Sequence, residues 1–86
     1  MDPIITGKNF SVFPNPSTGN FNLDLYFEDG EELEMTIYNS SAQVVDKKTL
    51  FSPTRLGFDL SRYGKGIYII VIRSGVTAYR EKIVIE

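Results

Sequence analysis

The side chains of this sequence that could take part in chemistry are carboxylates, and most of them gather in one short stretch. Glu28, Asp29, Glu31 and Glu32 lie almost next to one another, and Asp24 precedes them. Paired carboxylates can act as general acid and base, and clustered ones can bind calcium through hard oxygen ligands. Their spacing does not follow the Asp-x-Asp-x-Asp-Gly pattern of calcium-binding loops, and an acidic turn needs no ion. We therefore interpret the cluster as solvated turn charges and assign no metal ligand and no cofactor.

The remaining composition argues against an enzyme. The chain contains no His and no Cys, so the commonest general base and the thiol nucleophile are absent. It also lacks the Ser-x-x-Lys and Gly-x-Ser-x-Gly patterns that activate a serine. We expect a protein without catalytic residues.

Size and charge exclude other classes. A chain of 86 residues is long enough for one small domain. Nine Lys and Arg against eleven Asp and Glu give a net charge of -2, and the basic residues are scattered, so a nucleic-acid partner is not expected. The longest apolar run, residues 67–72, is far shorter than the roughly 20 residues of a membrane-spanning helix.

Short strand-like segments account for most of the chain. Turn residues separate them about every 8 to 12 positions, a spacing typical of antiparallel sandwiches, and no window has a helical period. We therefore predict an all-β fold, a small antiparallel Ig-like β-sandwich of about seven strands with no substantial helix. The expected strands cover residues 10–13, 21–27, 33–38, 44–50, 56–60, 67–73 and 77–85.

Three of these segments carry more specific expectations. Asp29-Gly30 is a strong hairpin signal, which predicts that residues 33–38 return alongside residues 21–27. Charged side chains at 46–48 indicate an exposed edge strand. Residues 67–73 are apolar on both faces, the pattern of a central strand.

Three motifs stand near the ends of the chain. In the first, residues 14–19, two prolines fix φ and withhold backbone donors, which stops the opening strand from pairing further. Turn-forming residues follow the prolines. In the second, Gly66 allows a bulge or a close backbone approach, and Tyr68 can bury its ring while its hydroxyl reaches a partner. The third reads as a terminal strand. The motifs are Pro14-Asn15-Pro16-Ser17-Thr18-Gly19, Gly64-Lys65-Gly66-Ile67-Tyr68 and Lys82-Ile83-Val84-Ile85-Glu86.

In this order and with this spacing, the motifs resemble the type A C-terminal sorting domain of the type IX, or Por, secretion system of Bacteroidota. The resemblance extends from about Phe10 to Glu86. It rests first on the turn with Pro14, Asn15, Pro16 and Gly19, and second on a Leu-Ser-x-x-x-x-Gly-x-Tyr stretch in which Gly66 and Tyr68 are the last two defined positions. The third ground is the set of C-terminal residues. The chain departs from the family pattern where residues 41–43 replace a common Gly-Lys turn. It also ends in Glu86 where family members often end in a basic residue.

The resemblance implies a non-catalytic export signal. The parent protein would enter the periplasm through its own N-terminal signal, and an outer-membrane translocon would then recognise the folded domain. In many members a sortase-like peptidase removes the domain and joins the cargo to surface lipopolysaccharide. The expected route is thus the periplasm in transit, then the cell surface or the exterior. The resemblance places translocon recognition at Lys82, Ile83, Val84, Ile85 and Glu86.

The resemblance also divides the chain. We expect residues 10–86 to form the sorting domain and residues 1–9 to be a linker or a vector-derived N-terminal segment, with the cargo domain upstream in the same polypeptide. Because a terminal strand can add to a partner's sheet, we expect residues 82–86 to be the docking element. Open edge strands also make a homodimer a possible assembly.

A carbohydrate-binding or adhesive accessory module of a secreted enzyme is the alternative. Five Tyr and six Phe could supply a stacking platform for sugars. Phe21, Phe27 and Phe58 fall on apolar faces and are expected in the core. The candidates for an exposed platform are Tyr26, Tyr38, Tyr63 and Tyr79, and three coplanar rings on one open face would favour sugar binding.

Overall fold

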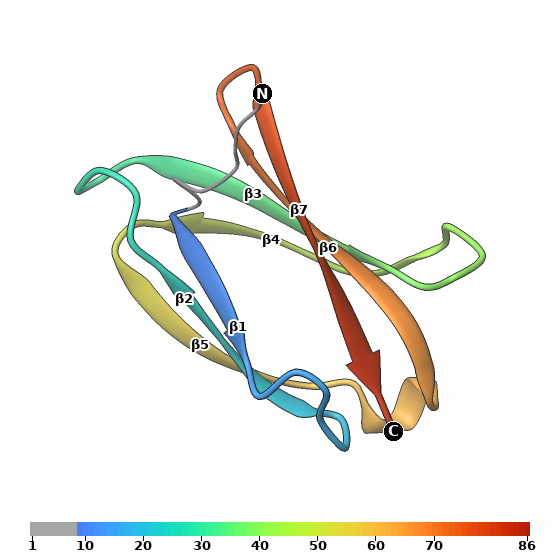
Figure 1. Ribbon diagram of the computed structural model, residues 1–86. Coiled ribbons are helices and arrows are strands. Elements are labelled where there is room, and N and C mark those ends of the chain that lie inside the picture. The colour runs from blue at the N-terminus through green and yellow to red at the C-terminus, as the bar shows by residue number, and fades with distance from the viewer. Residues whose placement is uncertain (1–8) are drawn as a thin grey trace, which may run out of the picture.

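The computed structural model describes residues 9–86, which form two antiparallel sheets packed face to face (Figure 1). One sheet has the strand order β1-β2-β5 and the other β4-β3-β6-β7. The strands are β1 (Phe10–Phe13), β2 (Asn20–Leu25), β3 (Glu32–Tyr38), β4 (Val44–Phe51), β5 (Thr54–Asp59), β6 (Gly66–Ser74) and β7 (Thr77–Ile85), and a single 3-10 turn, η1 (Ser61–Tyr63), precedes β6. The predicted seven-stranded all-β sandwich is confirmed.

Alternating apolar residues of both sheets form the core between them. Phe21 stacks on Phe58 across β2 and β5, with ring centroids 5.3 Å apart. Phe27 meets Tyr79 edge to face at 5.5 Å. Phe21, Phe27 and Phe58 are buried as expected. The buried apolar set is completed by Phe10, Leu23, Leu25, Leu33, Met35, Ile37, Leu50, Leu60, Tyr68, Ile70, Ile72, Ile83 and Ile85.

The hairpin prediction at Asp29-Gly30 is wrong. β2 and β3 do not pair, because the chain crosses from one sheet to the other between them. Gly30 does adopt a positive φ of 80°, but its N–H donates to the Ser52 carbonyl, and the Ser52 N–H donates to the Glu31 carbonyl. The buried Ser52 hydroxyl donates to the carbonyl of Phe27. Long-range bonds to the β4–β5 connection thus decide the course of this turn.

Two other strand predictions, the edge strand at residues 46–48 and the central strand at residues 67–73, agree with the order of strands in the sheet. β4 is an edge strand, as its charges indicated, and β6 lies between β3 and β7, as a central strand should. However, β6 is covered on one face only: Ile70 and Ile72 are fully buried, whereas Ile67 on the opposite face is 48% exposed.

The expected linker, residues 1–9, lies outside the described residues except for Asn9, whose carbonyl accepts a hydrogen bond from the Tyr26 N–H. Among the described residues, none belongs to a helix long and apolar enough to cross a membrane.

The β3–β4 turn, where the family commonly carries Gly-Lys, contains Ala42 at a φ of 64°. The Asn39 side chain stabilises the turn, because its Oδ1 accepts hydrogen bonds from the N–H groups of Ser41 and Gln43. Ala42 therefore holds a left-handed conformation that suits glycine better.

We expect Ala42→Gly to raise the free energy of unfolding by about 1 kcal/mol, because relief of the left-handed strain exceeds the entropic cost of glycine. Urea unfolding measures the change. Ala78→Gly, in β7, is the matched control and should destabilise by about 0.5–1 kcal/mol. Destabilisation by both substitutions would contradict the strain at Ala42.

Candidate functional site

The predicted recognition residues form the last part of β7, whose neighbour in the sheet is β6. Their side chains alternate between two environments. Ile83 and Ile85 are 0% and 3% exposed and belong to the core. Lys82 and Glu86 are exposed, and Val84 is half-buried on the outer face. A partner that meets the folded domain can therefore contact only part of the predicted set.

The Asn15 carboxamide binds the outer edge of this strand. Its Nδ2 donates to the Lys82 carbonyl at 2.7 Å, and its Oδ1 accepts the Val84 N–H at 3.0 Å. One residue of a parallel neighbouring strand would present its backbone N–H and C=O to these two groups. The side chain of Asn15 thus takes the place of the backbone of one such residue.

Ser17 continues this pairing toward the C-terminus with its backbone. Its N–H donates to the Val84 carbonyl at 3.0 Å, and its carbonyl accepts the Glu86 N–H at 2.8 Å. The result is a short parallel bridge between Ser17 and Ile85. Residues 14–19, called here the 14–19 loop, therefore cover the outer edge of β7 between Lys82 and Glu86 with four hydrogen bonds.

Gly19 fixes the other end of the 14–19 loop. Its N–H donates to the Ser17 hydroxyl at 3.2 Å, and its carbonyl accepts the Leu60 N–H at 2.8 Å. Its φ is 125°, and a Cβ at this position would lie 2.8 Å from the Cβ of Ser61. Only glycine satisfies both the backbone conformation and the close approach.

Asp59 orients Ser61 beneath this contact. The hydroxyl of Ser61 donates to Asp59 Oδ1 at 2.6 Å and its N–H donates to the same oxygen at 2.9 Å. These two bonds, the hydroxyl first, hold the pKa of the Asp59 carboxyl below its usual value of 3.8. The carboxylate therefore keeps its charge and holds Ser61 in place at neutral pH.

The Gly66 and Tyr68 motif supports the same end of the sandwich. The Tyr68 ring is buried and its hydroxyl donates to the Gly64 carbonyl at 2.7 Å, which confirms the predicted arrangement. Gly66 begins β6 at a φ of 144°, but no atom lies within 4 Å of the position a Cβ would take. The prediction of a close backbone approach at Gly66 is wrong, since its positive φ is the feature that suits glycine.

All three motifs thus meet at one end of the molecule, where the C-terminus lies beside η1 and the β1–β2 connection (Figure 1). Sequence reasoning gave Pro14, Asn15, Pro16 and Gly19 a turn-building role and missed that Asn15 binds β7. The available signal was an asparagine between two prolines, which turn chemistry alone does not require.

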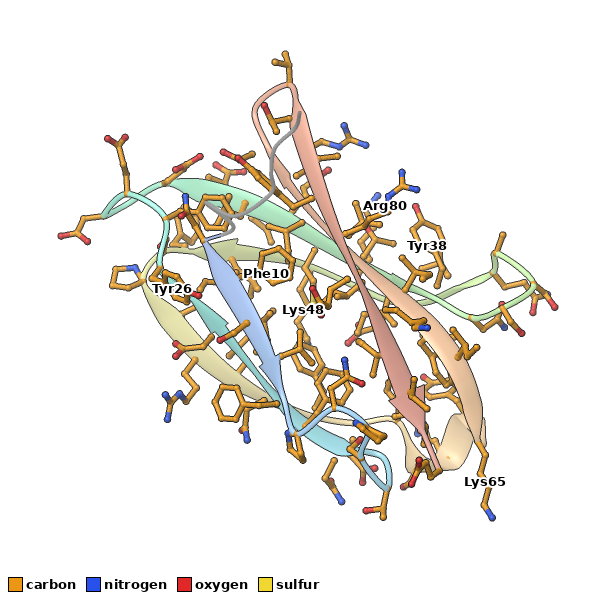
Figure 2. All side chains as sticks on the ribbon, in the orientation of Figure 1. Phe10, Tyr26, Tyr38, Lys48, Lys65 and Arg80 are labelled. Carbon is orange, nitrogen blue, oxygen red and sulfur yellow. The ribbon has the colours of Figure 1, made fainter. Side chains whose placement is uncertain are left out.

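The tyrosines considered for a sugar-binding platform lie apart from one another, and Figure 2 shows Tyr26 and Tyr38 on different parts of the sandwich. Tyr79 packs against the core, Tyr38 lies on the outer face of the four-stranded sheet, and Tyr26 and Tyr63 lie on separate connections. No three of these rings share an open face. Among residues 9–86, no cluster of three or more potential metal ligands occurs, and Asp24 forms an ion pair with Arg55 at 3.1 Å.

We expect Asn15→Asp to speed hydrogen exchange at the Val84 and Glu86 amides. The carboxylate has no donor for the Lys82 carbonyl, so one hydrogen bond worth about 1 kcal/mol is lost. The equilibrium constant for local opening, and with it the exchange rate, should rise roughly fivefold. Exchange followed by NMR measures the effect. Asn20→Asp, an exposed position at the start of β2, is the control and should leave both amides unchanged. Equal protection in both variants would contradict the role of Asn15.

Gly19→Ala should destabilise the domain by about 2 kcal/mol or more, because backbone strain and overlap with Ser61 add. Gly64→Ala, with a φ of 100° but open space around it, isolates the strain and should cost about 1 kcal/mol. Denaturant unfolding gives both values. A cost at Gly19 no larger than that at Gly64 would exclude the close approach as a constraint.

Comparison with known proteins identifies the family of the chain. The family model described as "Secretion system C-terminal sorting domain" matches residues 11–86, nearly the whole chain. A search of curated proteins finds no match. The chain therefore belongs to the Por secretion system C-terminal sorting domains, the non-catalytic signals that the type IX secretion machinery recognises to export cargo across the outer membrane.

Proposed function

We propose that the export signal is read from the C-terminal part of β7, Lys82, Ile83, Val84, Ile85 and Glu86, through addition of this strand to a sheet of the outer-membrane translocon. The observation that carries the proposal is the occupied outer edge of β7. Its backbone groups already pair in strand geometry, but their partner is the 14–19 loop rather than a strand of either sheet.

Exchange of the 14–19 loop for a partner strand is the simplest route to recognition. The side chains of Ile83 and Ile85 are buried, so a partner cannot contact them without opening the core. The backbone edge becomes accessible when four hydrogen bonds break, each worth about 1 kcal/mol net. Local opening of this kind requires less free energy than global unfolding.

The partner strand would also meet the outward side chains of β7. Cross-strand neighbours contribute to pairing, so Lys82 and Val84 provide the specificity that backbone bonds lack. We also propose that a cargo domain lies upstream in the same polypeptide and passes through the periplasm to the cell surface or exterior. In many members of the family a sortase-like peptidase then removes the signal and attaches the cargo, and such a peptidase is the second partner proposed for this domain.

A reporter protein fused ahead of the domain, carrying a periplasmic export signal, tests the proposal in a bacterium with a type IX system. Deletion of residues 82–86 should leave the reporter in the periplasm. Because the deletion also removes Ile83 and Ile85 from the core, a second variant, Lys82→Glu with Val84→Glu, changes only outward side chains. We expect it to lower surface reporter about fivefold or more, since each cross-strand pair contributes up to about 1 kcal/mol.

Lys47→Glu with Thr49→Glu is the matched control, because it changes outward positions on β4, the opposite edge of the same sheet. It should leave export unchanged. Thermal melts confirm that the substituted domains stay folded. Normal surface delivery by the folded Lys82 and Val84 variant, or an equal loss in the β4 control, would overturn the proposal.

A further inference from the structure

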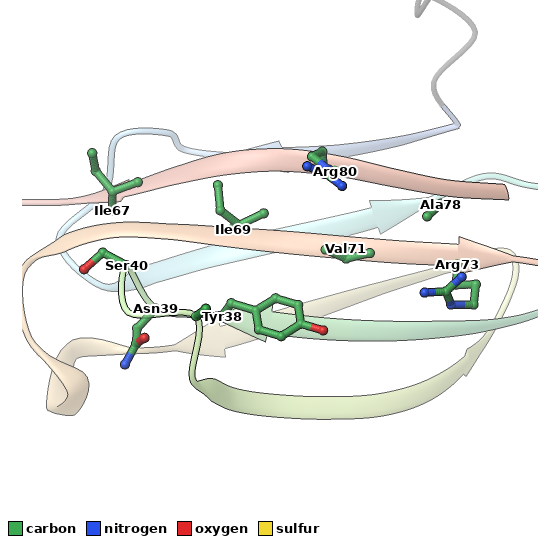
Figure 3. Close-up of a pocket in the computed structure, with 10 residues that line it drawn as sticks. Tyr38, Asn39, Ser40, Ile67, Ile69, Val71, Arg73, Ala78 and Arg80 are labelled. Carbon is green, nitrogen blue, oxygen red and sulfur yellow. The ribbon is translucent and has the colours of Figure 1, made fainter.

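The outer face of the four-stranded sheet carries a groove over β6, between β3 and β7 (Figure 3). Its volume is about 640 Å³. Ile67, Ile69 and Val71 of β6 line it together with Tyr38 of β3. In the close-up, the Tyr38 side chain extends along the β3 side of β6, and Arg80 of β7 lies on the other side.

Core formation does not account for these apolar side chains. β6 contributes Tyr68, Ile70 and Ile72 to the core from its inner face, which the three-stranded sheet covers. The outer-face residues alternate with them and have no second layer of sheet against them. Ile69 and Val71 are half-buried and Ile67 is about half exposed at 48%. An apolar floor of this kind on a small domain indicates an interaction surface.

Basic side chains border the apolar floor. In the sheet register Arg80 lies opposite Val71, Lys82 opposite Ile69, and Arg73 opposite Ala78. Within the described part of the chain, the structure records no ion pair for these three groups. Two acidic residues of this face lie in the first part of β3. Glu34 is opposite Arg73 in the sheet register, and both Glu32 and Glu34 are away from Ile67 and Ile69. A chain with net charge -2 thus gathers positive charge around an apolar groove.

We propose that this groove binds an extended, acidic segment of a partner polypeptide whose alternate residues are apolar. The apolar side chains would lie on Ile67, Ile69 and Val71, and the carboxylates would meet Arg73 and Arg80. In extended chains alternate side chains point the same way, so one such segment can satisfy both rows.

Charge and shape distinguish this partner from two others. A second copy of the domain packed through the same face would bring its own arginines against Arg73 and Arg80, which is unfavourable. A lipid bilayer requires apolar side chains that protrude, whereas Ile69 and Val71 form the floor of a hollow. The groove and the C-terminal edge of β7 share Lys82 at their border, but the interactions differ: the groove would bind side chains of a partner, whereas the edge of β7 offers backbone hydrogen bonds.

A fluorescein-labelled synthetic peptide of alternating glutamate and valine is a suitable probe, titrated with the full chain and followed by fluorescence anisotropy. We expect saturable binding that weakens as salt screens the charges. NMR of the isotope-labelled chain should place the shifts at Ile67, Ile69 and Val71. A peptide of alternating lysine and valine should not bind.

Two variants test the groove itself. Arg73→Glu with Arg80→Glu should weaken binding about tenfold or more, because attraction becomes repulsion. Lys48→Glu with Lys65→Glu makes the same charge change away from the groove and should have little effect. Ile69→Thr, which keeps every charge, should also weaken binding.

Equal weakening by the two charge reversals would overturn the proposal, because net charge alone would then explain binding. Peptide shifts outside the groove would overturn it too. The proposal would also be overturned if the peptide did not bind and the groove had another occupant. Binding to vesicles of anionic phospholipid, or concentration-dependent dimerisation, would identify that occupant if Arg73→Glu with Arg80→Glu abolished it. The assay contains no secretion machinery, so failure of the β7 export experiment leaves its result unaffected.

Discussion

A strand at the edge of a sheet leaves half of its backbone groups without partners, and at the C-terminal end of β7 the Asn15 carboxamide supplies them. One side chain provides both the donor for Lys82 and the acceptor for Val84. Ser17 extends the pairing, and Gly19 anchors the same loop against Ser61. Because the loop follows β1 of one sheet and pairs with β7 of the other, this contact joins the two sheets at one end of the sandwich.

The same contact reconciles two demands on the C-terminal strand. A stable monomer must cover its edge, whereas a sorting signal must offer something to a partner. A loop that pairs through one side chain and one residue's backbone protects the edge, yet it can leave without disturbing either sheet. The buried side chains of Ile83 and Ile85 hold the strand on β6 in the meantime. Whether the outer edge of β7 is covered or accessible therefore depends on how weakly the 14–19 loop is held, rather than on the packing of the core.

The four-stranded sheet thus presents two surfaces with different physical character. The β7 edge offers backbone hydrogen bonds, and the outer face offers an apolar floor between basic side chains. Both follow from the composition of β6 and β7, since β6 is apolar on both faces and β7 alternates between core and outward positions. The three-stranded sheet, by contrast, contributes mainly core residues, and Leu60, directly after β5, donates the hydrogen bond that holds Gly19.

The sequence by itself determined the strands, the core face of those that alternate strictly, and the family, because a period of two residues and local turn chemistry are encoded in neighbouring positions. It placed β7 at residues 77–85 and buried Phe21, Phe27 and Phe58, as observed. Tertiary structure alone decided that β2 and β3 lie in different sheets, that Asn15 binds β7, and that one face of β6 stays uncovered. These outcomes depend on contacts between distant residues, such as those of Gly30 with Ser52 and of Asn15 with Lys82. No local pattern specifies such contacts, since the free energy that selects them exists only once the sheets have packed.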